Sequence, residues 1–157
     1  MIESGDISYS PPWKNALAVL FGPDGYTYGQ LIPHDALQGA LGLPKPVGRI
    51  TADEYEAWKL RLVGQVEALS DALLKDRNMC LQSVAGQGYK IVEPEKQTAF
   101  AVKQGQKGLR SALSKMGRRL SFVDRAALTN DQAKENADAL ARLSFLKAQV
   151  GRQRLTG

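Results

Sequence analysis

The chain has 157 residues, of which 43% are hydrophobic and 24% are charged, and its formal net charge at pH 7 is +5. These values are ordinary for a soluble protein of one domain, or of one small domain with an appendage. No apolar run approaches the roughly 20 residues that cross a bilayer, and the N-terminus has no long apolar stretch. We therefore expect neither a membrane span nor a secretory signal, and a cytoplasmic location.

The sequence has one cysteine, Cys80, and one histidine, His34. One cysteine cannot form an internal disulfide, and the two residues together are too few for a zinc site built from His and Cys. Nothing around His34 indicates a nucleophile or a triad, and the acids near residue 53 are explained by the start of a helix. We expect no metal, no cofactor and no enzymatic activity.

Charge is divided unevenly along the chain. Residues 1–95 contain 8 Lys and Arg against 12 Asp and Glu, a net of −4, whereas residues 96–157 contain 13 against 4, a net of +9. Such an asymmetry indicates that the basic part meets a polyanion or pairs with an acidic surface, although a solvated basic helix would look the same.

The first third of the chain predicts short elements. Residues 1–14, with two adjacent prolines, indicate an irregular arm. Residues 15–22 are apolar and could form a strand or the first turns of a helix, because periodicity does not decide so short a run. A glycine-rich turn follows, and then a short helix with Pro33 at an early position, an exposed His34 in its first turn, and an apolar face made by Ile32, Leu37, Ala40 and Leu41.

A long helix and a β-hairpin come next. Thr51 and Glu54 form a capping box, so residues 52–76 make one amphipathic helix or two helices broken near Gly64. The runs MCLQSV and YKIV have the composition of paired strands around the turn AGQG, where glycines can adopt positive φ. Pro94 ends the second strand.

The hairpin carries a family resemblance. Gly86, Gly88 and Tyr89 form a G-x-GY turn, flanked by the apolar strand positions Val84 and Ile91. Residues 31–92, and residues 61–92 most specifically, resemble the winged helix-turn-helix DNA-binding domain of OmpR-type response regulators. The resemblance implies a recognition helix within residues 52–76 and a hairpin wing anchored by the tyrosine ring. This sequence differs from the family pattern in Ala85, where an arginine is usual, and in the acids of the long helix.

The C-terminal third is helical in pattern. Residues 95–123 and the segment after a second capping box at 129–132 predict an antiparallel helix pair. The last helix has an apolar stripe made by Ala133, Ala137, Leu140, Leu143, Phe145, Leu146 and Val150. The sequence therefore predicts an α+β, mostly helical chain with an arm at 1–14, a winged helix-turn-helix domain at 15–94 and a basic helical region at 95–157.

Residues 96–119 contain seven bases and no acid. At 100° per residue, Lys103, Lys107 and Arg110 share one face of a helix and Arg118 lies close to it; we call these four residues the basic ridge. The predicted nucleic-acid contacts are Lys103, Lys107, Arg110, Arg118 and Arg119 in this segment, Arg61 and Gln65 in the long helix, and Gln87 and Lys90 in the hairpin.

Two hypotheses from different classes follow. In the first, the chain binds double-stranded DNA as a regulator of transcription or an accessory factor. The winged domain fixes its position, and the basic region contacts the backbone or forms a homodimer. In the second, it is a small interaction protein, similar in general style to proteins encoded by bacteriophages. Its winged domain binds another protein, its basic helices dock on an acidic surface, and the target is a host polymerase or defence system.

Overall fold

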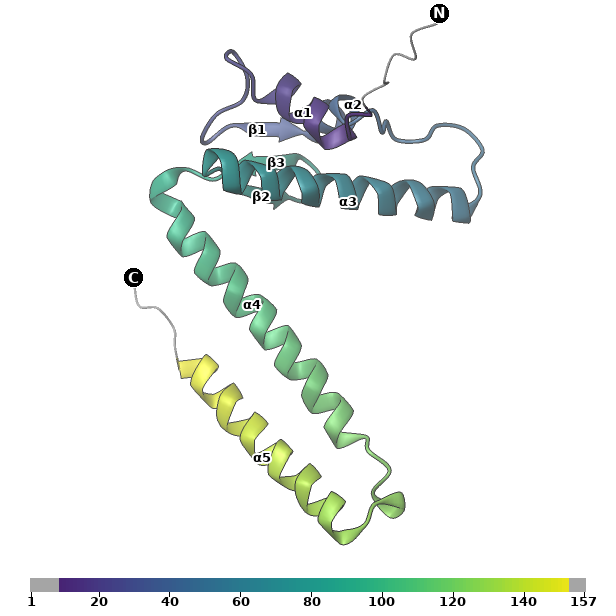
Figure 1. The fold of residues 1–157 in the computed structure, drawn as a ribbon, viewed down its shortest axis with the longest axis vertical. Helices are drawn as coiled ribbons and strands as arrows, with labels where there is room; N and C mark the ends of the chain where they lie inside the picture. Colours follow the sequence, from purple (N-terminus) through teal and green to yellow (C-terminus); the bar gives the residue numbers. More distant parts are fainter. Residues whose placement is uncertain (1–8, 153–157) are drawn as a thin grey trace, which may run out of the picture. The chain divides into compact units, whose positions relative to one another are not determined.

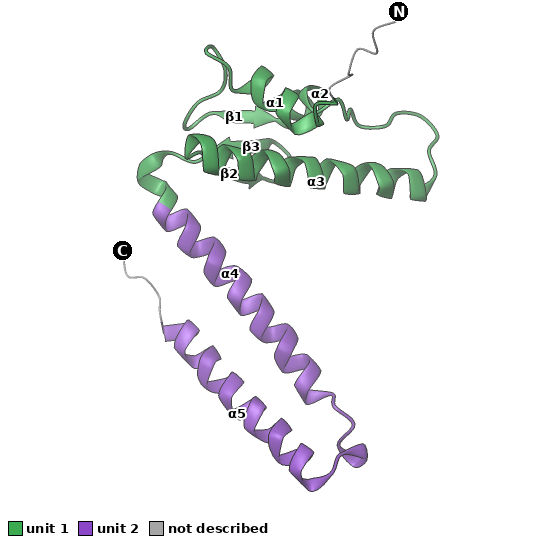
Figure 2. Ribbon diagram, in the orientation of Figure 1, with its two compact units in different colours: residues 1–97 green, residues 98–157 purple. Residues whose placement is uncertain are grey.

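The computed structural model describes residues 9–152. It divides into two compact units, unit 1 at residues 1–97 and unit 2 at residues 98–157 (Figure 2). Unit 1 combines helices with a small sheet, and unit 2 is built from helices (Figure 1). The predicted α+β, mostly helical class is confirmed.

Unit 1 places helices against a three-stranded antiparallel sheet. Its elements are α1 (Pro12–Leu20), β1 (Leu31–Pro33), α2 (His34–Ala40), α3 (Ala52–Arg77), β2 (Leu81–Val84) and β3 (Gly88–Ile91). The strand order is β1-β3-β2, so the hairpin that was predicted from the glycine turn is joined on its β3 side by an earlier strand.

That earlier strand corrects the prediction for residues 31–41. Ile32 was placed on the apolar face of a short helix, but it lies in β1, opposite Tyr89 of β3, and the helix begins at His34. Pro33 has φ −60° and ψ 150°, an extended conformation, and the ring of a proline also keeps the residue before it extended. Ile32 is fully buried even so, because its strand position points into the same core.

The N-terminal arm is shorter than predicted. Residues 1–8 lie outside the described residues, and α1 begins at Pro12, so residues 12–14 are helical rather than irregular. Proline is tolerated in the first helical turn, where its missing N–H would have had no partner. The run at 15–22, for which strand and helix were both open, is helical up to Leu20.

One hydrophobic core holds unit 1 together. It collects buried side chains from both helices and strands, namely Ala16, Leu20, Phe21, Ile32, Leu37, Leu41, Leu69, Leu73 and Ile91. The two α3 members of this core belong to the last third of that helix. Figure 1 shows the first half of α3 extending past the sheet and the short helices, and its Leu60 is 71% exposed.

The ends of α3 follow the sequence signals. The side chain of Thr51 accepts a hydrogen bond from the Glu54 backbone N–H, and Glu54 accepts one in return from the Thr51 backbone N–H. The helix then continues through Gly64 without a break to Arg77, and Asn78 ends it in the left-handed conformation at φ 56°. Of the two predictions for residues 52–76, the single helix is correct.

Unit 2 is an antiparallel pair of helices (Figure 1). Helix α4 (Pro94–Ser121) leads into unit 2, a 3-10 turn at Arg125–Ala127 follows, and α5 (Asn130–Arg152) returns. The second capping box is confirmed, since Thr129 and Gln132 exchange hydrogen bonds between side chain and backbone. The amide nitrogen of Asn136 donates to the Leu120 carbonyl and ties the two helices near their connection.

The helix pair has a thin core. Among its described residues only Leu113, Gly117 and Leu143 are buried. At Gly117, side chains of α5 lie directly against the backbone of α4: a Cβ atom there would lie 2.9 Å from Leu143 Cδ2 and 2.9 Å from Lys147 Nζ. Phe145, which was predicted to belong to the apolar stripe of the last helix, is 63% exposed.

Replacing Gly88 by alanine tests the closure of the unit 1 sheet. Gly88 has φ 152°, and a Cβ atom would overlap the carbonyl oxygen of Ile32 in β1. We expect Gly88→Ala to destabilise unit 1 by about 2–4 kcal/mol. Urea unfolding followed by tryptophan fluorescence measures this, because Trp13 and Trp58, the two tryptophans of the chain, both lie in unit 1.

Gly64→Ala is the matched control. Gly64 lies inside α3 with no atom within 4 Å of a Cβ position, so alanine should stabilise the helix by about 0.5–1 kcal/mol. Equal unfolding midpoints for the two variants would contradict the role assigned to Gly88.

Candidate functional site

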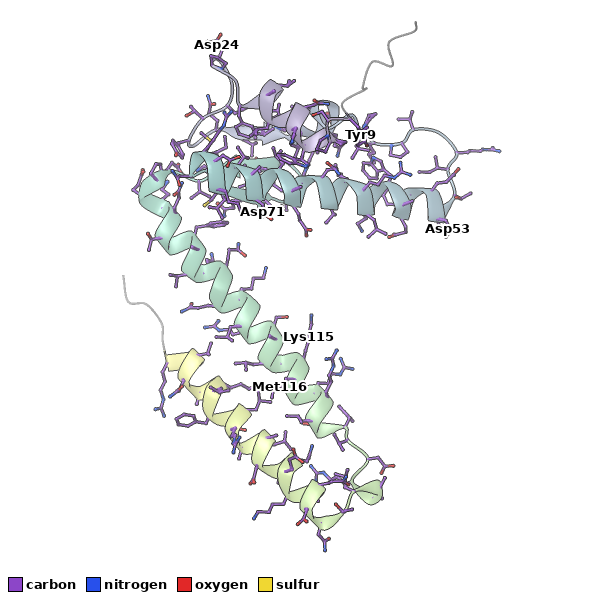
Figure 3. The ribbon with its side chains drawn as sticks, viewed as in Figure 1. Tyr9, Asp24, Asp53, Asp71, Lys115 and Met116 are labelled. Atoms are coloured by element: carbon purple, nitrogen blue, oxygen red, sulfur yellow. The ribbon has the colours of Figure 1, made fainter. Side chains whose placement is uncertain are left out.

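Two of the predicted nucleic-acid contacts, Arg61 and Gln65, lie on α3, and only the arginine is exposed and without a hydrogen-bond partner within the described residues. Arg61 is exposed, whereas Gln65, one turn later, is partly buried and its Oε1 accepts a hydrogen bond from the Trp13 backbone N–H at 3.1 Å. Gln65 therefore helps to join α1 to α3, and its carbonyl oxygen is occupied. Asp53 and Asp71, which Figure 3 labels on α3, are both exposed.

Of the two predicted contacts in the hairpin, Gln87 is an exposed polar side chain and Lys90 is a cation in an ion pair. Gln87 is exposed in the turn. Lys90 Nζ lies 3.0 Å from Glu93 Oε1, and Lys96 Nζ lies 3.1 Å from the same oxygen. A hydrogen bond from the backbone of Glu93 itself, and then those from Lys90 and Lys96, lower the pKa of the Glu93 carboxyl from 4.5 to about 2. Lys90 thus has an acidic partner at neutral pH.

The turn residues of the hairpin occupy the conformations that the sequence predicts. Gly86 and Gly88 both have positive φ, at 72° and 152°. The Tyr89 ring meets the edge of the His34 ring on α2, with centroids 5.8 Å apart, so His34 is partly buried rather than exposed. Because neighbouring strand residues point to opposite faces, Lys90 lies on the other face of the sheet from Tyr89.

Tyr89 also lines a groove of about 430 Å³ in unit 1. The groove runs between α2 and the first half of α3, and aromatic and aliphatic side chains dominate it, together with two lysines. The lining residues are His34, Asp35, Leu37, Gln38, Lys45, Tyr55, Trp58, Lys59, Leu62, Val63, Val66 and Tyr89. Trp58 is fixed in it, because its indole N–H donates to the Leu43 carbonyl at 3.2 Å.

The basic ridge lies along α4 within unit 2. Lys103, Lys107, Arg110 and Arg118 are all exposed. Within residues 9–152, the only ion pairs are the two made by Glu93, and none of the four ridge cations has an acidic partner within 4.0 Å. Their charges are therefore open to an external anion.

Lys147 on α5 extends the basic ridge. Its ammonium lies against Gly117 of α4, one residue before Arg118. Arg110, Ser114 and Lys147 line a second groove, of about 270 Å³, together with Leu113, Val150 and Gly151, and no acid belongs to this lining. The pairing of the helices thus adds a cation that the sequence analysis did not include.

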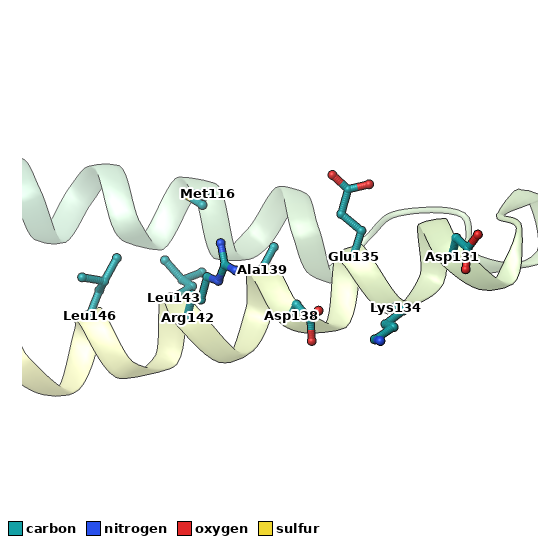
Figure 4. A pocket seen from close by; sticks show the side chains of 9 residues that line it. All are labelled: Met116, Asp131, Lys134, Glu135, Asp138, Ala139, Arg142, Leu143 and Leu146. Carbon is teal, nitrogen blue, oxygen red and sulfur yellow. The ribbon is translucent and has the colours of Figure 1, made fainter.

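The other side of the helix pair has a different charge. Arg110 and Met116 lie three residues before and after the buried Leu113, so they point about 60° to either side of it. A groove of about 650 Å³ opens on the Met116 side, and its lining includes Asp131, Glu135 and Asp138 of α5 (Figure 4).

Two further bases of α4 lie outside the ridge. Figure 3 shows Lys115 on the side of α4 away from α5. Arg119 lies about 140° from the middle of the ridge, between the directions of Met116 and Lys115. The predicted contact at Arg119 is therefore separated from those at Lys103, Lys107, Arg110 and Arg118.

The predicted contacts fall into separate groups. Arg61, Gln65, Gln87 and Lys90 belong to unit 1, where Lys90 is already paired and Gln65 is engaged. The basic ridge belongs to α4 of unit 2, and Lys147 joins Arg110 in a groove whose lining contains no acid. A glycine inside a helix often marks a close helix contact, so Gly117 was the signal from which a neighbour such as Lys147 could have been sought.

Comparisons of the chain with protein-family models, curated proteins and solved structures found no match. Between residues 9 and 152, no helix is long and apolar enough to cross a bilayer. The same part of the chain contains no cluster of three or more His, Cys, Asp or Glu side chains that could hold a metal ion.

The Glu93 ion pairs predict a pH dependence of unit 1. Because the folded chain keeps Glu93 ionised to a lower pH than the unfolded chain does, its contribution to stability is present above 4.5 and is lost as the pH falls through about 2. Glu93→Gln removes this contribution. The unfolding free energies of wild type and variant, from tryptophan fluorescence in urea, should differ at neutral pH and converge near pH 2.

Asp71→Asn provides the comparison, because Asp71 is exposed on α3 and has no ion pair within the described residues. Its unfolding free energy at neutral pH should equal that of wild type. A Glu93→Gln profile parallel to that of wild type over the whole range would contradict the assignment.

Proposed function

We propose that this chain binds double-stranded DNA through the basic ridge and Lys147 of unit 2. The observation that carries the proposal is the row of exposed cations on α4, unpaired within the described residues, joined by a cation from α5 on a side of the helix pair without acids. Unit 2 holds 12 basic and 4 acidic residues, a net of +8, whereas unit 1 has a net of −3.

The length of the ridge suits a phosphate backbone. Lys103 and Arg118 are 15 residues apart, or about 22 Å along the helix, a distance over which one DNA strand presents about six phosphates. Cations that meet phosphates release condensed counterions, and this term supplies most of the affinity that does not depend on base sequence. Flexible lysines with two arginines are suited to backbone contacts rather than to base reading.

We propose unit 1 as a winged helix-turn-helix domain that positions the chain. The order of short helix, long helix and β-hairpin supports this, as do the positive φ values of Gly86 and Gly88. The acids on α3 and the pairing of Lys90 with Glu93 argue that unit 1 contributes little to phosphate binding. The chain would then act as a regulator of transcription or an accessory factor in DNA metabolism.

The aromatic groove of unit 1 favours a second function, the binding of a protein partner. Tyr55 and Val63 are exposed on α3 and line this groove together with Lys45 and Lys59. A partner that presents an apolar side chain flanked by acids would fit it. In this function, Val63→Glu abolishes capture of the partner and leaves DNA affinity unchanged, whereas loss of the ridge cations leaves capture intact.

Removing ridge cations tests the DNA-binding proposal. Lys103, Lys107 and Arg110 are changed together to alanine in the full chain, and binding to a short random-sequence duplex is followed by fluorescence anisotropy between about 50 and 200 mM salt. The loss of three phosphate contacts should weaken binding about 100-fold near 0.15 M salt and reduce the slope of log K against log salt by about 3.

The matched control removes the same charge from unit 1. Lys45, Lys59 and Lys75 are exposed, and changing all three to alanine should weaken binding far less. Equal losses of duplex affinity in the two triple variants would mean that net charge alone determines affinity. That result would contradict a specific role for the basic ridge. Absence of duplex binding by wild type at about 50 mM salt would rule out the proposal.

A further inference from the structure

Unit 2 leaves an apolar and charged face of its helix pair uncovered. Met116 is 46% exposed and Leu146 is 44% exposed, and both line the groove of about 650 Å³ (Figure 4). Leu109, seven residues before Met116 and on the same side of α4, is 47% exposed. Within the described part of the chain only three residues of these helices are buried, so covering this face would enlarge a small core.

The exposed residues of α5 on this side form a regular stripe. Asp131, Glu135, Asp138, Arg142, Phe145 and Gln149 follow one another at spacings of four, three, four, three and four. Residues at this spacing lie along one face of a helix, and five of the six side chains are charged or polar. All six are exposed, so the stripe has no occupant within the described residues.

The charges of the stripe are complementary to those of a second, antiparallel copy of the same stripe. The first half of α5, residues 130–141, contains three acids and Lys134, whereas the second half, residues 142–152, contains three bases and no acid. The members of the stripe are placed symmetrically about residue 140, with Asp138 two residues before it and Arg142 two residues after it. An antiparallel copy of α5 would therefore set Asp138 opposite Arg142 twice, while a parallel copy would set like charges together.

From this arrangement we infer that two copies of the chain associate through unit 2, with α5 antiparallel to α5 of the second copy across residue 140. The two helix pairs form a four-helix bundle in which Leu109, Met116 and Leu146 are covered and two reciprocal Asp138–Arg142 ion pairs set the register. Within the described residues neither Asp138 nor Arg142 has an ion-pair partner inside its own chain.

The size of the face agrees with a stable dimer. Helix α5 has 23 residues and is about 35 Å long, and a face two helices wide spans about 20 Å, so each copy would bury roughly 700 Å². Stable interfaces bury about 800 Å² per partner. The basic ridge lies on the other side of the buried Leu113 and stays uncovered, so the inference does not depend on what the ridge binds.

Charge exchange between Asp138 and Arg142 tests the inference on the full chain. Sedimentation velocity of wild type should give twice the 17.1 kDa mass of one chain at micromolar concentration. Asp138→Arg places arginine opposite arginine, and Arg142→Glu places acid opposite acid, so each variant alone should dissociate about 10- to 100-fold more readily.

Mixing the two variants is the decisive measurement. In a mixed dimer, the arginine introduced at position 138 of one chain faces the glutamate introduced at position 142 of the other. The native Arg142 of the first chain then faces the native Asp138 of the second, so the mixture should form a dimer that neither variant forms alone. Arg125→Glu, the same charge change in the connection between the helices, should remain dimeric.

A chain that carries both substitutions restores the two opposite charges in exchanged positions. This double variant should also regain the dimer, which keeps the test informative if a single variant loses helix content by circular dichroism. Failure of the double variant to dimerise while its helix content equals that of wild type would contradict the reciprocal ion pairs.

A wild-type chain that sediments at the mass of one copy even at about 100 times that concentration would overturn the inference. Single variants as dimeric as wild type would overturn the proposed face, and a mixture that stays monomeric would overturn the antiparallel register. A monomeric wild type that captures a different protein through Met116 would assign the face to another partner and would also overturn it.

Discussion

The close passage of β1 along Gly88 organises unit 1. At this point the two backbones are so near that no side chain fits between them, and the antiparallel pairing of β1 with β3 depends on it. Once β1 is paired, Ile32 is directed into the core with Ile91, and α2 starts immediately at His34. The last third of α3 then closes this core with Leu69 and Leu73.

In unit 2 the distribution of charge, rather than a large core, distinguishes the sides of the helix pair. Few side chains are buried between α4 and α5, so the sides of the helix pair are distinguished mainly by where their charges lie. Cations without ion pairs in the described part of the chain occupy one side, with Lys147 reaching over Gly117 to join them, while the acids of α5 gather beside Met116 on the other. The repulsion among these cations weakens an isolated helix, and a bound polyanion relieves it. These are the two sides to which we assign the proposed DNA contact and the inferred second copy.

Sequence signals were sufficient where they were local. Three kinds of signal depend only on residues close together in the chain, and the structure has all of them. They are the capping boxes at Thr51 and Thr129, the glycine turn of the hairpin, and the basic character of residues 96–119. Strand β1 was missed because three residues carry no periodicity and Ile32 pairs with Tyr89, 57 positions later. The engagement of Gln65 by Trp13 and the position of Lys147 also depend on partners far along the chain, so composition and spacing could not reveal them.

The contact at Gly117 couples three positions that are far apart in the sequence. A larger residue at 117 would meet both the Leu143 Cδ2 methyl group and the Lys147 ammonium, so both side chains would have to move or change. In sequences that descend from a common ancestor with this chain, positions 117, 143 and 147 should therefore vary together rather than one at a time. Such covariation would be visible without any structure, and it would show whether the cation at 147 was retained for its charge or only as a by-product of the packing at 117.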